Sequence, residues 1–247
     1  MFRNLFTAAV VAALCAGLVF TLIQQTRLTP LIVAAESFEG APEAHAHEGE
    51  VAPHTHEEGT SAHSHGDDEW MPQDGFERAG YTVLANLLAA TGFALVIGAV
   101  ALLAGLPISG RTGLLWGIGG YAAFSLAPAF GLPPGLPGMA VADTLARQVW
   151  WWGTALATGA ALLAVARWRT AWAVGLAVAL IALPHVIGAP QPPDEATAVP
   201  ANLAANFAAA VLFANAVMWV VLGGVFGFVA DRLAARSLRP AAAGAAA

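Results

Sequence analysis

Histidine pairs are the residues of this sequence best suited to chemistry. Three His-x-His units recur at a spacing of nine residues. They are His45 and His47, His54 and His56, and His63 and His65. In an extended chain, residues two apart point to the same side, so both imidazoles of a pair can reach one metal ion. Imidazole with nearby carboxylate suits divalent Zn, Ni, Co or Cu without choosing among them.

The segment around these pairs is strongly polar. Residues 34–78 hold twelve of the sixteen acidic residues and six of the seven histidines. Such a segment cannot bury enough apolar surface to offset its ordering entropy, so we expect it to be disordered without a ligand and to bind metal weakly. Two other interpretations stay open: a solvated acidic spacer, and a pH sensor whose imidazoles charge near about pH 6.5.

The seventh histidine, His185, lies in an apolar stretch instead. At 1.5 Å per residue from Ala171, it stands about 21 Å up a hydrocarbon core about 30 Å thick. Pro184 removes a backbone donor and frees the carbonyl of Leu180, so we expect the helix to break there. Broken helices often expose ligand sites in transporters. The alternative is a helix-ending proline beside an interfacial histidine that hydrogen-bonds a neighbour.

Other polar residues of the apolar stretches are expected to join helices rather than bind ligands. Most of them stand near the level of His185: Gln24, Gln25, Asn86, Gln148, Asn202 and Asn206, with Asn215 deeper. Asp143 and Arg147 are four residues apart, which predicts a local helical ion pair.

The elements that must position these residues are membrane helices. Of 247 residues, 58% are hydrophobic and 11% charged, against about 45–50% and about 25% in soluble domains. Mean hydropathy is +0.67. Six apolar segments are long enough to suggest spans: 5–23, 81–106, 113–132, 149–166, 171–187 and 203–229. The third contains four early glycines and Pro128, so five spans remain an alternative.

These segments predict an all-α, polytopic membrane bundle. We expect a first transmembrane helix in 1–33, an outer loop in 34–80, a five-helix bundle in 81–230 and a cytoplasmic Arg/Ala tail in 231–247. Two groups of glycines favour close helix packing. They are Gly113 with Gly117, and Gly223 and Gly224 with Gly227. An alternative for the first segment is a signal peptide cleaved after Val33-Ala34-Ala35.

Arginine placement predicts the orientation, because positive residues in short flanks stay cytoplasmic. With six spans, seven arginines share the side of the termini and three lie on the other side. The seven are Arg3, Arg111, Arg167, Arg169, Arg232, Arg236 and Arg239, and the three are Arg27, Arg78 and Arg147. Both termini are therefore expected to be cytoplasmic.

Composition also excludes several classes of function. The chain has no lysine, which excludes a P-loop ATPase and a Schiff-base enzyme. Cys15 is the only cysteine, which excludes an intrachain disulfide, a CxxC pair and a thiolate zinc site. A net charge of −6 argues against a nucleic-acid partner. No hydrolytic motif occurs in its required context, so we expect no enzymatic activity and no tightly bound cofactor.

Taken together, the motifs resemble the CbtA family of predicted cobalt transporter subunits. The resemblance runs over nearly the whole chain, and only the combination of pieces is specific. The matching pieces are Met1-Phe-Arg-Asn-Leu-Phe6, Gln24-Gln25, Ala35-Glu36-Ser-Phe-Glu39, Glu69-Trp70-x-Pro72-x-Asp74-Gly75-x-Glu77-Arg78, Leu132-Pro-Pro-Gly-Leu-Pro-Gly138, Asp143 with Arg147-Gln148-x-Trp150-Trp151, Leu183-Pro184-His185-x-Ile187-Gly188-Ala189-Pro190, and Val199-Pro200 with Asn202 and Phe207.

The resemblance implies uptake of Co²⁺ for cobalamin synthesis in a bacterial inner membrane, with a small single-span, His-bearing partner of the CbtB type. It also implies about five spans. Seven residues at motif positions become candidates for the metal path: Glu36, Glu39, Glu69, Asp74, Glu77, Asp143 and His185.

We therefore expect a transporter subunit that captures a divalent metal on its His-x-His loop and passes it to a site near His185. Uptake of Ni²⁺ or Zn²⁺, a non-transporting metal sensor or accessory protein, and a membrane enzyme are the alternatives. A homo-oligomer is possible.

Overall fold

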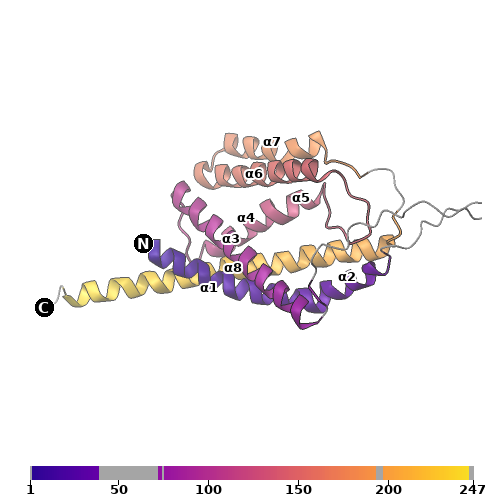
Figure 1. Ribbon diagram of the computed structural model, residues 1–247. Helices are drawn as coiled ribbons and strands as arrows, with labels where there is room; N and C mark the ends of the chain where they lie inside the picture. The colour runs from indigo at the N-terminus through magenta and orange to yellow at the C-terminus, as the bar shows by residue number, and fades with distance from the viewer. Residues whose placement is uncertain (1, 39–71, 74, 193–196, 245–247) are drawn as a thin grey trace, which may run out of the picture.

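The computed structural model describes residues 2–38, 72–73, 75–192 and 197–244 (Figure 1). Over these ranges all regular structure is helical, without a strand. The expected all-α membrane bundle is thereby confirmed.

The first helical segment runs without interruption from Phe2 to Glu36. It comprises α1 (Phe2–Ile23), a π-helical turn (Gln24–Leu28) and α2 (Thr29–Glu36). The apolar run that predicted this helix stops at Ile23, so the helix extends well past it. Pro30 lies in the first turn of α2, where its missing N–H is tolerated, and the wider π turn precedes it.

α3 (Phe76–Ala104) and α8 (Ala201–Gly244) pack against α1. The shared surface is rich in alanine, including Ala8, Ala12 and Ala94, each fully buried. Small side chains let these backbones approach closely. α8 is much longer than its neighbours and projects beyond them at its C-terminal end (Figure 1).

The third predicted segment is helical over 113–129, as α4 (Gly113–Tyr121), a second π turn (Ala122–Leu126) and α5 (Ala127–Ala129). Gly113, Gly117 and Gly120 face α8, whereas Gly119 faces Leu162 on α6. A Cβ on Gly117 would overlap the carbonyl oxygen of Trp219, and one on Gly113 would overlap that of Gly223. Gly227 fits closely as well, whereas nothing lies within 4 Å of a Cβ on Gly224. The predicted glycine packing is therefore confirmed, with Gly224 as the exception.

α6 (Thr144–Trp168) and α7 (Ala171–Ile187) form a tight hairpin. Arg169 makes the turn at φ 51°, and the rings of Trp168 and Trp172 are 4.9 Å apart across it. The expected helix break at Pro184 is wrong, because α7 stays helical through this residue. The Pro184 carbonyl accepts hydrogen bonds from Gly188 N (3.0 Å) and Trp150 Nε1 (3.1 Å), which hold the last turn together.

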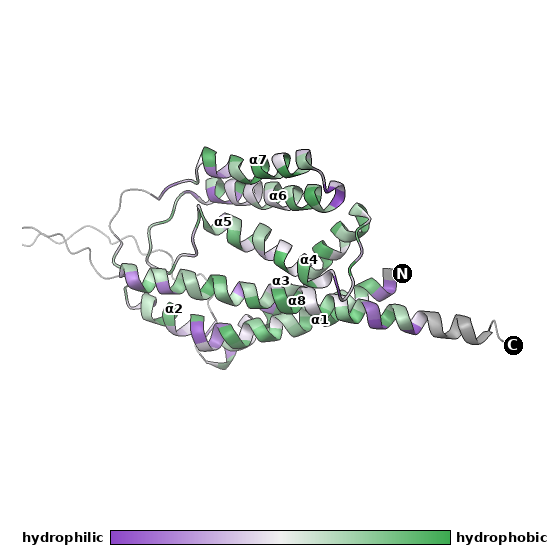
Figure 2. Cartoon of the chain, turned by 180° about the vertical axis from the view of Figure 1, so that it is seen from behind, coloured by the Kyte–Doolittle hydropathy of each residue, from purple (hydrophilic) through white to green (hydrophobic). Residues whose placement is uncertain are grey.

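Four helices of the described chain are long and apolar enough to span a membrane: Arg3–Glu36, Phe76–Ala104, Thr144–Trp168 and Ala201–Ser237. α7, with 17 residues, is shorter, about 25 Å at the usual rise. All six predicted apolar segments are thus helical, and four of them meet the length and hydropathy of a full span. Figure 2 shows hydrophobic residues along every helix and hydrophilic ones gathered mainly toward helix ends.

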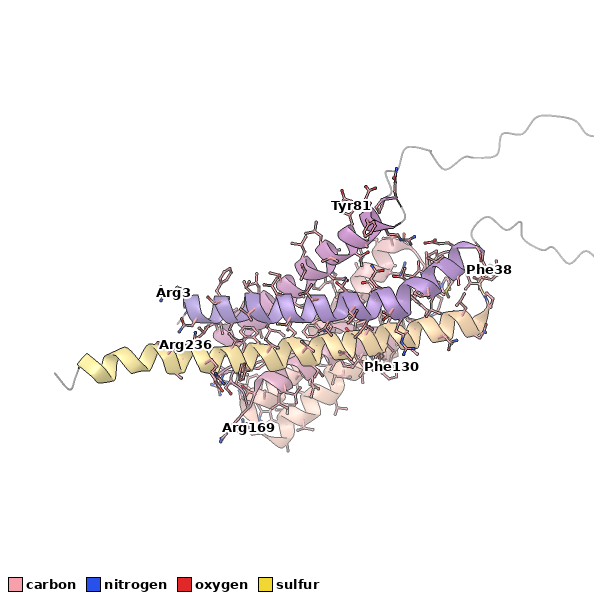
Figure 3. All side chains as sticks on the ribbon, turned by 90° about the horizontal axis from the view of Figure 1, so that it is seen from below. Arg3, Phe38, Tyr81, Phe130, Arg169 and Arg236 are labelled. Atoms are coloured by element: carbon pink, nitrogen blue, oxygen red, sulfur yellow. The ribbon has the colours of Figure 1, made fainter. Side chains whose placement is uncertain are left out.

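The helices form layers (Figure 1). The α6–α7 hairpin lies on one side, α1, α3 and α8 on the other, and the α4–α5 segment between them. Both chain termini lie at the same end of the bundle. Arg3, Arg169 and Arg236 lie toward that end, whereas Phe38 and Phe130 lie toward the opposite one (Figure 3).

Candidate functional site

A cavity of about 770 Å³ lies between the α4–α5 segment, α6 and α7. Most of its wall is apolar. The polar and aromatic side chains in the wall are Phe130, Trp150, Thr158, His185 and Gln191. The cavity is therefore large enough for a small ligand with water, and only a few side chains can bind that ligand.

His185 is held in this wall by its neighbours. The indole N–H of Trp150, on α6, donates a hydrogen bond to the carbonyl of Pro184, the residue before His185. The Trp150 ring also contacts the imidazole edge-on, with ring centroids 5.8 Å apart. Phe130 makes a similar contact at 6.2 Å. Within the described part of the chain, the half-buried imidazole has no hydrogen-bond partner. A ring nitrogen is therefore available to bind a metal ion or water.

Thr158, on α6, is a wall residue that the sequence reasoning missed. Its side chain is 3% exposed, and its hydroxyl has no hydrogen-bond partner among the described residues. Thr154, one turn earlier, follows the usual pattern, because its hydroxyl donates to the Trp150 carbonyl at 2.9 Å. No sequence signal distinguishes the two threonines; only their surroundings do.

A second cavity, of about 460 Å³, lies between α3, α5, α6 and α8. Arg147, Gln148, Ser125 and Asn215 are among its polar lining residues. The Arg147 guanidinium has no ion pair with any described residue. Its positive charge makes this cavity unfavourable for a cation.

Asp143 does not pair with Arg147. Its carboxylate instead accepts a hydrogen bond from Ala146 N at 2.8 Å and caps the N-terminus of α6. The predicted ion pair is therefore wrong: a carboxylate at this position satisfies an unpaired amide of the first turn. A role for Asp143 in the metal path stays a prediction.

Two other predicted carboxylates have protein partners. Glu36, at the end of α2, forms an ion pair with Arg78 at the start of α3, with 2.5 Å between Oε1 and Nη2. Glu77 accepts a hydrogen bond from Gln73 N at 3.2 Å. The Glu36–Arg78 pair therefore ties together the two helices that flank the long polar segment.

The remaining predicted ligands lie outside the described residues. They are His45, His47, His54, His56, His63, His65, Glu39, Glu69 and Asp74. Over the ranges that are described, no three His, Cys, Asp or Glu side chains gather closely enough to hold a metal ion. α7, which contains His185, and α2, which contains Glu36, lie in different layers of the bundle (Figure 1).

Amide side chains behave as expected between α1 and α3. Asn86 donates hydrogen bonds to Thr21 Oγ1 at 3.1 Å and to Gln24 Oε1 at 2.7 Å, so these three residues link the two helices. Asn215 bonds only the carbonyl of Val211 on its own helix, at 2.9 Å.

Comparison with known proteins identifies the family of this chain. No curated protein and no solved structure gives a significant match. A family model described as "Probable cobalt transporter subunit (CbtA)" matches residues 2–231, which is nearly the whole chain. The protein is therefore a member of the CbtA family.

Proposed function

We propose that this protein takes up Co²⁺ across a bacterial inner membrane for cobalamin synthesis, with His185 as an intramembrane metal ligand. Family membership implies a cobalt transporter subunit; the choice of metal, its route and the partner are our proposal. The observation that carries it is the unpaired imidazole of His185 in the wall of a cavity of about 770 Å³.

Electrostatics favours this cavity over its neighbour. A divalent cation would meet the Arg147 guanidinium in the smaller cavity, whereas no arginine or lysine is among the described residues that line the larger one. The faces of Phe130 and Trp150 can also attract a cation. Neutral imidazole is a common ligand of divalent transition metals.

Capture would begin on the outer loop. The His-x-His pairs and neighbouring carboxylates concentrate the ion, which then moves toward Glu36, Glu69 and His185. Both termini would be cytoplasmic, with the arginine-bearing end of the bundle inside. The membrane potential is worth about 2.3 kcal/mol per charge per 100 mV, so a divalent ion gains about twice that on entry.

The word "subunit" in the family description implies partner proteins. We propose a small single-span, His-bearing CbtB-like protein as that partner. Its histidines would supply metal ligands that this chain lacks, because His185 has no second His, Cys, Asp or Glu nearby among the described residues.

The test is uptake of ⁵⁷Co²⁺ by energised cells that express the chain with and without the small partner. We expect wild type to raise cobalt entry and His185→Ala to lower it about tenfold at equal membrane abundance. An excess of Ni²⁺ or Zn²⁺ should compete poorly. Trp172→Phe, at the opposite end of α7, is the matched control and should behave as wild type.

Cobalt entry at the empty-vector level, with partner and potential present, would overturn the proposal. Strong competition by Ni²⁺ or Zn²⁺ would instead reassign the metal. If deletion of 44–65 abolished a metal response while leaving uptake intact, the loop would belong to a sensor rather than to a transport path.

A further inference from the structure

We propose that the Thr158 hydroxyl is a second ligand group of the His185 cavity, binding the partly hydrated divalent cation deeper in the membrane. This inference rests on the proposed function and extends it to Thr158, which is uncharged and belongs to none of the sequence motifs. Thr158 and His185 come from different helices and line the same cavity.

The first argument is the unsatisfied hydroxyl. A buried hydroxyl without a hydrogen bond costs about 1–3 kcal/mol, and a threonine on a helix can usually avoid this by bonding its own backbone. Thr154 does so, and Thr158 does not. Thr158 is one of the residues of the cavity wall, and its hydroxyl oxygen is buried beneath that wall. A turn of the side chain toward the cavity would let water or an ion supply the missing partner.

The second argument is depth. His185 lies fourteen residues after the start of α7, about 21 Å from the arginine-bearing end. Thr158 lies ten residues before the end of α6 at Trp168, about 15 Å from that end. It therefore stands about 6 Å deeper than His185, near the middle of a core about 30 Å thick, where transporter folds commonly hold their substrates.

The third argument is ligand chemistry. Co²⁺ accepts both nitrogen and oxygen ligands, and a hydroxyl oxygen can bind the ion directly or accept a hydrogen bond from its bound water. Binding first by one imidazole and then, deeper, by one neutral hydroxyl holds the ion weakly at each position, as release toward the other side requires. Over the described residues, the polar side chains of the cavity wall are His185, Thr158, the exposed Gln191 and Trp150. The indole N–H of Trp150 already donates to the Pro184 carbonyl.

Two threonines on one helix provide the test. Thr158→Val removes the unpaired hydroxyl and keeps the shape, and Thr154→Val does the same to a hydroxyl that bonds its own helix. We expect Thr158→Val to raise KM for ⁵⁷Co²⁺ uptake at least fivefold, Thr158→Ser to restore it, and Thr154→Val to stay within twofold of wild type. Equal KM values for the two valine variants would overturn the inference.

A second measurement does not depend on transport. Cys15 is the only native thiol, so Thr158→Cys in a Cys15→Ala background of the full chain presents one thiol at the site. A small cationic thiol reagent should label it, with labelling slowed at least fivefold by Co²⁺ but not by Mg²⁺. Thr154→Cys should stay unlabelled. Absence of labelling at both positions would overturn the inference.

The two outcomes separate the claims. If wild type moved no cobalt but Co²⁺ still protected Thr158→Cys, the transport proposal would fail and the cavity site would stand. If uptake required His185 while Thr158→Val kept a wild-type KM, the transport proposal would stand and the role of Thr158 would fall.

Discussion

Polar groups are arranged differently in the two halves of the bundle. Between α1 and α3, Asn86 bonds Thr21 and Gln24, and the Glu36–Arg78 ion pair closes the end of the same interface. Between α6 and α7, His185 and Thr158 line a cavity without a partner in the described structure.

This contrast separates polar residues that hold helices together from those that are available to a ligand. A polar side chain in a membrane costs free energy unless it is paired or meets water. In the α1–α3 half, other side chains pair with these polar groups, so the residues stabilise the contact between the two helices. In the α6–α7 half no described side chain pairs with them, which is why we propose that those residues bind a ligand.

The largest effect should come from the packing that joins the two halves. Gly117→Ala places a methyl group against the Trp219 carbonyl on α8, and overpacking costs about 1–3 kcal/mol. Unfolding in mixed micelles should show this loss. Gly159→Ala on α6, where nothing lies within 4 Å, should leave stability unchanged or slightly raised. Equal effects of the two substitutions would contradict the close α4–α8 contact.

Next comes the amide link. Asn86→Ala removes two interhelical hydrogen bonds and should lower unfolding stability by about 1 kcal/mol, a usual value for such bonds in membranes. KM for cobalt should stay within twofold. Thr91→Ala, whose hydroxyl bonds only its own helix, should change stability by less than about 0.5 kcal/mol. A large change in KM with Asn86→Ala would place this interface on the metal path.

A smaller effect is expected for the ion pair. The side chains of Glu36 and Arg78 are 35% and 32% exposed. Exposed ion pairs contribute about 0.2–1 kcal/mol to the free energy of unfolding. A double-mutant cycle with Glu36→Gln and Arg78→Gln should give a coupling in this range that falls at high salt. Loss of cobalt uptake in Glu36→Gln, but not in Arg78→Gln, would show that the Glu36 carboxylate is a metal ligand and not only one half of a structural ion pair.

The smallest effect on stability belongs to His185. His185→Phe keeps an aromatic ring beside Phe130 and Trp150 and removes only nitrogens that have no partner, so stability should change by less than about 0.5 kcal/mol. Cobalt uptake should nevertheless fall about tenfold. A stability loss above about 1 kcal/mol would show that the imidazole is structural and would remove the contrast between the halves.

Sequence patterns were most reliable where they depend on local chemistry. The apolar run 171–187 matches α7 residue for residue, because apolar composition and the flanking turn residues set both ends. The glycines at 113, 117, 223 and 227 do pack closely. By contrast, the first helix runs beyond its apolar run to Glu36, where the Arg78 pair and packing against neighbouring helices stabilise it.

Two local expectations were wrong. Pro184 was expected to break α7, yet α7 stays helical through it, and the indole of Trp150, from another helix, donates a hydrogen bond to its carbonyl. Asp143 was expected to pair with Arg147, yet its carboxylate caps α6 by accepting a hydrogen bond from Ala146 N, three residues along. The first outcome involves a helix that the sequence does not place beside Pro184. The second was a choice between two local partners of one carboxylate, and in the fold the first-turn amide is the partner.

The amino-acid sequence by itself determined that this is a helical membrane protein of the CbtA family, because hydropathy and a dispersed set of motifs are properties of the chain alone. Tertiary structure alone decided which polar residues face each other and which face a cavity. Thr154 and Thr158 are the same residue type one turn apart, yet in the described structure the first hydroxyl bonds its own helix and the second has no partner.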